Sequence, residues 1–308
     1  MAHPAPVEQP IYPLYNTTYT LHRLSPLSSL PPSSLPAHAR ALQDILTGSS
    51  LRGVRIGLDA SDTALSRVGA LKSVSMRPLR SPEGWAAIHT TDETTLPDDT
   101  DEDGSWGVII EIVYEKAGYT AILLRDITHP PPSAAEDGAP THLPLLLTRL
   151  PPPLRTTLLE FLTTRFDAHA SPLHLSSSFL KKALGGYIDA LSASGGDVKN
   201  TLRDIVISLA FPPDPSAETD DSGRGDLKGI DVTISRDDVS EFLEHGNTAA
   251  GETPEHAFWA ALGKYTSHHL ALDMSHPATD VVKIACGAFV VAKEGRVKIS
   301  APGAGGGE

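Results

Sequence analysis

The sequence lacks the features that mark membrane, disulfide-bonded and most enzymatic proteins. Its single cysteine, Cys286, cannot form a disulfide within the chain. It has neither an apolar N-terminal signal segment nor an apolar run of about 18 residues, so we expect a soluble intracellular protein with no membrane contact. The motifs GxGxxG, GxSxG, HExxH and CxxC are absent, as is GxxxxGK followed by Ser or Thr. The sequence therefore predicts no cofactor and no catalytic residue.

A group of histidines near the C-terminal end is the best candidate for a metal or acid-base site. It comprises His256, His268, His269, Asp273 and His276. If a helix continued that far, His269 and Asp273 would lie one turn apart, but no second pair has the spacing of metal ligands. We therefore predict surface or capping roles for these residues, no metal, and a buried, unreactive Cys286.

Negative charge is concentrated in two segments. The formal net charge is −13, but seven acids lie between residues 92 and 103 and five between residues 214 and 226. We predict acidic loops at 92–103 and 212–228, and a folded remainder that is nearly neutral. The acidity argues against an autonomous DNA-binding protein, because sequence-independent affinity for DNA depends on clustered cations.

The chain divides by composition into two folded parts. We predict a disordered lead (1–10), a β-rich subdomain (11–129), a Pro-rich linker (130–140), an α+β subdomain (141–300) and a disordered tail (301–308). Strands and helices come in uneven groups without a βαβαβ alternation. This pattern predicts an α+β fold with antiparallel β-sheets and packed helices rather than a doubly wound fold.

Hydrophobic periodicity and turn residues define the expected elements. Strands are predicted at 14–27, 51–59, 71–79, 106–114, 119–126, 204–211 and 230–234. Helices are predicted at 37–46, from 151, after Ser176 as N-cap, after Ser235 as N-cap, and from Pro254 with Thr253 as N-cap.

The segment 281–300 predicts two strands joined by a two-residue turn at Glu294 and Gly295, near a sheet edge where another strand could pair. This register opposes Val290 to Ile299. It gives an apolar face of Val282, Ile284, Cys286, Ala288, Val290, Ala292, Val297 and Ile299. The other face mixes cations with large apolar groups, so we expect a helix or a partner to cover it. The residues predicted to bind a partner are Val281, Lys283, Phe289, Val291, Lys293, Arg296 and Lys298. A core hairpin with a solvated basic rim is the alternative.

Six cations and only two acids lie between residues 52 and 80. The cations are Arg52, Arg55, Arg67, Lys72, Arg77 and Arg80. Contact with the DNA backbone is one interpretation of this excess, and a solvated sheet face is the other.

Three passages carry a family resemblance. They are LYNTTYTLHRLSPL at 14–27, LKGIDVTISRDDV at 227–239, and 257–299 with IACGAFVV at 284–291 and EGRVK at 294–298. Together they resemble the fungal kinetochore subunits of the centromere protein L family, over residues 11 to 299.

The resemblance implies a non-enzymatic subunit of the inner kinetochore, within the constitutive centromere-associated network, located in the nucleus at the centromere. It implies a heterodimer with a centromere protein N-like subunit through the C-terminal sheet, contacts with other inner kinetochore subunits, and binding of the centromeric nucleosome or DNA through that complex. When alone, such a subunit is expected to form a homodimer or aggregate. The alternative is an enzyme or small-molecule binding protein with an unrecognised pocket, which would be a defined species by itself.

Overall fold

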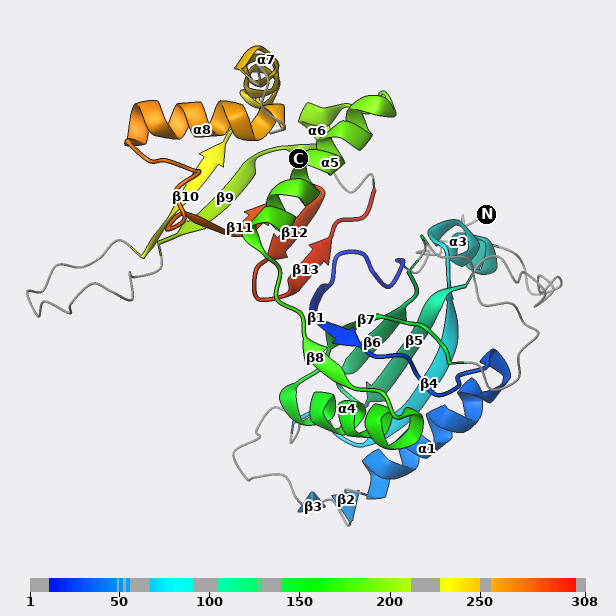
Figure 1. The fold of residues 1–308 in the computed structure, drawn as a ribbon. Coiled ribbons are helices and arrows are strands. Elements are labelled where there is room, and N and C mark those ends of the chain that lie inside the picture. Colours follow the sequence, from blue (N-terminus) through cyan, green and yellow to red (C-terminus); the bar gives the residue numbers. More distant parts are fainter. Residues whose placement is uncertain are drawn as a thin grey trace, which may run out of the picture. The chain divides into compact units, whose positions relative to one another are not determined.

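The computed structural model describes residues 11–48, 50–51, 54–55, 67–90, 105–126, 128, 140–211, 228–249 and 256–302. The chain forms two compact units (Figure 1). Unit 1 comprises the residues up to Pro13 together with Tyr19–Leu173, and unit 2 comprises Leu14–Thr18 together with the residues from His174 onward. The predicted lead, linker, acidic loops and tail lie almost entirely outside the described residues.

Unit 1 is built on an antiparallel sheet with the strand order β8-β1-β7-β6-β5-β4. Its strands are β1 (Thr18–Leu24), β4 (Leu71–Arg80), β5 (Ser105–Tyr114), β6 (Gly118–Leu124), β7 (Leu145–Arg149) and β8 (Ala170–Pro172). The short strands β2 (Ser50–Leu51) and β3 (Val54–Arg55) form a separate ladder. The hairpin predicted at 106–126 is confirmed, because β5 and β6 pair and the Tyr114 N–H donates to the Ala117 carbonyl at 2.8 Å.

Helices cover one face of this sheet (Figure 1). They are η1 (Pro32–Ser34), α1 (Leu35–Gly48) and α4 (Pro152–Phe166), whereas α3 (Pro82–Thr90) lies at the end of β4, where the Trp85 ring centre is 6.0 Å from Arg77. Leu42 of α1 and Leu158 of α4 are fully buried and share a core with Ile110 and Leu123 of the sheet. The apolar stripes of these helices therefore pack on one face of the sheet and form a single core with it.

Unit 2 is built on a second antiparallel run of strands, ordered β10-β9-β11-β12-β13. These strands are β9 (Ile205–Ala210), β10 (Gly229–Ile234), β11 (Asp280–Ala285), β12 (Phe289–Ala292) and β13 (Arg296–Ile299). The C-terminal hairpin of β12 and β13 ends the strand order of this unit. The outer side of β13 is partly occupied, because Tyr15 bridges Ile299 and the Asn16 N–H donates to the Ile299 carbonyl at 2.7 Å.

The described residues of unit 2 also form the helices α5 (Ser177–Ala193), α6 (Val198–Leu202), α7 (Val239–Ala249) and α8 (Ala257–Leu270). The predicted Ser176 cap is confirmed, since its hydroxyl accepts from the Phe179 N–H at 3.1 Å. The predicted Thr253 cap is wrong, because α8 begins later and the ring of His256 accepts from the Phe258 N–H at 3.2 Å. Among the described helices, none combines the length and apolar character needed to cross a membrane.

The fold is α+β on antiparallel sheets, as predicted, but the chain divides at a different place. The division between the units falls after Leu173 rather than at residues 130–140. The physical reason is β7, which pairs with both β6 and β1, and α4, whose apolar stripe lies in the core of unit 1. These two elements tie residues 145–166 to the N-terminal strands.

Candidate functional site

Two tight turns shape the C-terminal segment, where the sequence predicted only one. The predicted single strand from 281 to 293 is broken between β11 and β12, where the Cys286 N–H donates to the Phe289 carbonyl at 2.8 Å. Gly287 lies at this break, and a Cβ there would lie 2.6 Å from the Thr201 carbonyl oxygen. Only glycine permits this close approach of the two backbones. The turn at Gly287 separates β11 from β12, so residues 280–299 form three strands rather than two.

The second turn has three residues, Lys293 to Gly295, rather than two. Gly295 has φ of 77°, which suits the left-handed position of a three-residue hairpin loop. Phe289 therefore opposes Ile299, and Val291 opposes Val297. The predicted register was wrong by one residue, and such a slip exchanges which cross-strand neighbours share a face.

The inner face of the hairpin is the one that packs on α5. Tyr187 of α5 meets Phe289 edge to face, with 5.4 Å between ring centroids, and the Ser177 hydroxyl accepts from the Val281 N–H at 3.0 Å. Val281 and Val291 are buried on this face. The large apolar residues of the predicted partner-binding set therefore lie under a helix of the same chain.

The cations of that set lie elsewhere. Strand pairing places three of them on the outer face, away from α5. Ala292 pairs with Lys283 on one side and Arg296 on the other, and Val290 pairs with Lys298. Lys293 lies in the turn and forms an ion pair with Asp280. The expectation that cations surround Phe289 and Val291 on one face is thus wrong, and the structure separates the seven predicted residues into an inner apolar group and an outer basic group.

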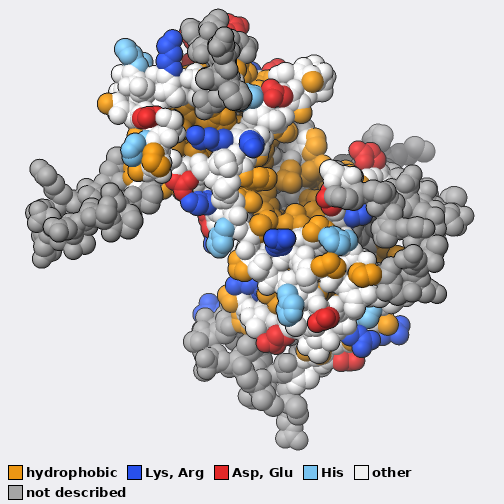
Figure 2. Space-filling model, in the orientation of Figure 1, with side chains coloured by type: hydrophobic (Ala, Val, Ile, Leu, Met, Phe, Trp, Pro, Cys, Tyr) orange, Lys and Arg blue, Asp and Glu red, His pale blue; other side chains and the backbone are white. Residues whose placement is uncertain are grey.

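α5 covers the inner face only in part, and an apolar patch remains where Tyr187 of α5 meets the hairpin. It consists of Tyr187, Phe289, Val297 and Ile299, which we call the hairpin patch. Tyr187, Phe289 and Val297 are half-buried, and Ile299 is 37% exposed. Figure 2 shows hydrophobic side chains gathered beside α5, over β12 and β13. Sequence reasoning did not identify Val297 and Ile299 as surface residues, because the predicted two-residue turn placed them on the apolar core face.

The basic residues predicted to contact DNA are only partly described. Arg52 lies outside the described residues, and Arg55 is placed by its backbone alone, on β3. Arg67 and Lys72 are exposed at the start of β4, which is an edge strand. Arg77 forms an ion pair with Glu111 at 2.5 Å and lies 6.0 Å from the ring centre of Trp85.

Arg80 of β4 is only half-exposed, and it is engaged with other groups of the chain. The described part of this set therefore leaves Arg67 and Lys72 as the most accessible cations.

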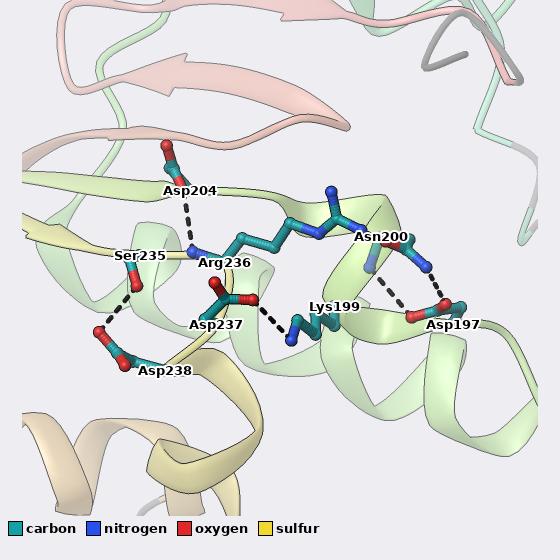
Figure 3. Close-up of polar contacts among 8 residues, drawn as sticks. All are labelled: Asp197, Lys199, Asn200, Asp204, Ser235, Arg236, Asp237 and Asp238. Carbon is teal, nitrogen blue, oxygen red and sulfur yellow. Dashed lines mark hydrogen bonds and ion pairs between the residues drawn. The ribbon is translucent and has the colours of Figure 1, made fainter.

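A cluster of polar side chains joins α6 to the turn between β10 and α7 (Figure 3). The Arg236 N–H donates to the Asp204 carboxylate at 2.8 Å, and Lys199 pairs with Asp237 at 2.7 Å. That contact with Lys199 holds the pKa of the Asp237 carboxyl below its ordinary value. Each carboxylate labelled in Figure 3 accepts a hydrogen bond or forms an ion pair within the cluster. The cluster therefore stabilises the turn, and none of these carboxylates is free to bind a ligand.

The Ser235 hydroxyl in this cluster donates to the Asp238 carboxylate at 2.8 Å, and α7 begins at Val239. Ser235 is therefore not the helix N-cap that the sequence predicted.

In the predicted histidine group, His256 and His276 accept backbone N–H groups, and His268 and His269 are exposed. His256 caps α8 through Nδ1 and contacts Asp189 through Nε2 at 3.0 Å, so Nε2 carries the proton of the neutral ring. The His276 ring accepts from the Ala278 N–H at 3.1 Å. Within the described ranges, no three His, Cys, Asp or Glu side chains are placed to hold a metal ion.

One buried titratable group, His22, was not found by sequence reasoning, whereas Cys286 was predicted to be buried and is half-buried. His22 of β1 is buried, and desolvation, with the nearby Arg155 charge, lowers its ring pKa. Burial raises the pKa of the Cys286 thiol, which makes the reactive thiolate scarcer at neutral pH. Neither group has the setting of a catalytic residue.

Comparison with known proteins identifies the family. A family model described as centromere protein L matches residues 13–308, which is nearly the whole chain. A search of curated proteins found no match. The chain therefore belongs to the centromere protein L family, a structural family of kinetochore subunits that act at the centromere in chromosome segregation.

Proposed function

We propose that this protein is a non-enzymatic subunit of the inner kinetochore that pairs with a centromere protein N-like subunit through the hairpin patch. The observation that carries the proposal is the half-covered apolar surface of Phe289, Val297 and Ile299 at the end of the unit 2 strand order. Apolar patches of this kind on soluble proteins often mark protein contacts. Membership of a family of kinetochore subunits supports a protein partner over a small ligand.

The contact is expected to use the face of the hairpin rather than its edge. Asn16 already occupies part of the outer side of β13, accepting from the Ala301 N–H through its side chain at 3.2 Å. A partner strand could not replace these bonds without displacing the N-terminal segment. Other inner kinetochore subunits, and chromatin, would then be bound by the assembled pair.

Replacing Ile299 by Asp should weaken binding of the partner subunit by about 30-fold or more. A carboxylate in the patch would be desolvated only in the complex, which is the situation of an interface hot spot. The measurement is a pull-down followed by isothermal titration with the purified partner, with circular dichroism to verify folding.

Val113 of β5 supplies the matched control for this change, because it is a β-strand residue with 38% exposure, close to the 37% of Ile299. Val113→Asp should leave partner binding unchanged. Equal binding by the wild type and Ile299→Asp would place the interface elsewhere. Size exclusion of the subunit alone should also show homodimers that Ile299→Asp reduces.

DNA contact by the β4 region is proposed only within the heterodimer. Each phosphate contact contributes roughly −0.9 to the slope of log affinity against log salt, so Arg67→Ala with Lys72→Ala should flatten the slope by about one to two units. Arg77→Ala should change it little, because Glu111 already neutralises that cation. The measurement is fluorescence anisotropy on a mixed-sequence duplex at several salt concentrations. An unchanged slope in the double variant would show that these cations do not contact DNA. Their role would then be to keep the edge strand β4 from pairing with another chain.

A further inference from the structure

The outer face of the unit 2 sheet carries a second surface, opposite to the hairpin patch. Hydrogen-bonded neighbours place Lys283, Ala292 and Arg296 in one cross-strand row. The next row places Val206, Ala285, Val290 and Lys298 side by side. Lys283 and Arg296 are exposed, whereas Lys298 and the small apolar residues of its row are half-buried. This basic face is defined by Lys283, Arg296 and Lys298 around Ala285 and Val290.

The charge of the basic face is not balanced by nearby acids. Lys293 is neutralised by Asp280, so it does not contribute. In unit 2 as far as it is described, none of the three cations of the basic face forms an ion pair with a carboxylate. Asp231 lies on the same side of the sheet but on β10, separated from Lys283 by β9. Glu294 is the only acid between residues 281 and 300.

The spacing of these cations suits an extended acidic chain. Arg296 and Lys298 are two residues apart on one strand, which separates them by roughly 6.5 to 7 Å. Lys283 and Arg296 lie on opposite sides of β12, at about twice the interstrand distance of 4.8 Å. Alternate side chains of an extended segment repeat at the same roughly 7 Å period, so two carboxylates could meet Arg296 and Lys298 together.

The apolar centre of the basic face favours an acidic protein segment over DNA as its partner. Val206, Ala285 and Val290 are short side chains that leave a shallow apolar strip beside the cations. DNA phosphates would match the cations but would leave this strip without a counterpart. A protein segment that combines carboxylates with small apolar side chains would match both parts.

We propose that the basic face binds an extended acidic protein segment in which carboxylates alternate with small apolar residues. Because this face is opposite to the hairpin patch, the hairpin can be contacted on both sides, by the partner subunit on one and by the acidic segment on the other. The proposal does not depend on the identity of the partner subunit.

The test compares binding of three labelled probes to the full chain, alone and in the heterodimer. The probes are a short peptide of alternating Glu and Val, the same peptide with Lys in place of Glu, and a mixed-sequence DNA duplex. Reversing all three cations, as Lys283→Glu, Arg296→Glu and Lys298→Glu, should weaken binding of the Glu peptide by about tenfold or more.

A matched variant reverses three exposed lysines of unit 2 that are outside the basic face: Lys182→Glu, Lys228→Glu and Lys264→Glu. It has the same change in net charge and should bind the Glu peptide nearly as well as wild type. Glu294→Lys adds a cation to the turn beside the face and should tighten binding by about threefold. This last variant keeps the test decisive even if the triple reversal fails to fold.

Several results would overturn the proposal. One is equal loss of peptide binding in both triple variants together with no gain from Glu294→Lys, which would show an effect of net charge alone. Another is tighter binding of the DNA duplex than of the Glu peptide, with only DNA binding lost when the three cations are reversed.

A different result would support the proposal. Loss of partner-subunit binding in Ile299→Asp, with Glu-peptide binding intact, would show that the two surfaces act separately.

Discussion

Val291→Asp should strongly destabilise unit 2, because Val291 is only 7% exposed and lies between Ile284 and Val297 on the face that packs on α5. The change removes buried apolar surface and places a carboxylate among buried apolar side chains. We expect a loss of about 3 to 5 kcal/mol in the free energy of unfolding, a large share of the 5 to 15 kcal/mol typical of folded domains. Denaturant unfolding followed by circular dichroism and intrinsic fluorescence measures it.

The matched control is Ile299→Asp, which places the same carboxylate on the same face of the hairpin but at a half-open position. It should change the free energy of unfolding by less than about 1 kcal/mol while reducing partner binding. A Val291→Asp variant as stable as wild type would mean that this side chain faces solvent. In that case the inner face, and with it the hairpin patch, would have to be reassigned.

Gly107→Ala should destabilise unit 1 by about 3 kcal/mol. Gly107 has φ of 154°, and a Cβ there would lie 1.8 Å from the Leu123 carbonyl oxygen. The strand pair β5 and β6 would have to separate, or Gly107 would have to change its backbone conformation, and either adjustment disturbs the ladder. Thermal and denaturant unfolding of the full chain should show a transition at lower temperature and lower denaturant.

Gly118 gives the comparison within the same pair of strands. It begins β6, is exposed, and would place a Cβ with nothing within 4 Å. Gly118→Ala should therefore be nearly neutral, within about 0.5 kcal/mol. Equal stability of the two alanine variants would show that β5 can shift at Gly107 without cost.

The elements with strong local signals could be predicted from the sequence. The alternation of Ile110 and Ile112 with Glu111 predicted β5, and the repeat of Leu180, Leu184 and Ile188 after Ser176 predicted α5. β7 was missed because Leu146 and Leu147 are both buried. A short strand covered on both faces has no alternation that would distinguish it from a segment of buried helix.

The candidate site depended on turn length, which the sequence did not determine. Glu294 and Gly295 are compatible with a two-residue turn, and the choice of three residues becomes visible only in the pairing of Phe289 with Ile299. Because the turn has one more residue than predicted, Arg296 and Lys298 lie on the opposite face of the hairpin from Phe289. The sequence could therefore predict which segment carries the site, but not which residues share a surface.

The position of residues 14–18 in unit 2 has a consequence for synthesis on the ribosome. Asn16 is synthesised well before its bonding partner Ile299, to whose carbonyl its N–H donates. At about 5 to 20 residues per second, the roughly 280 intervening residues take about 15 to 60 s to translate. During that interval residues 14–18 have no partner strand, so unit 2 can be completed only after Ile299 has been synthesised, and a fragment beginning at His174 would lack this segment altogether.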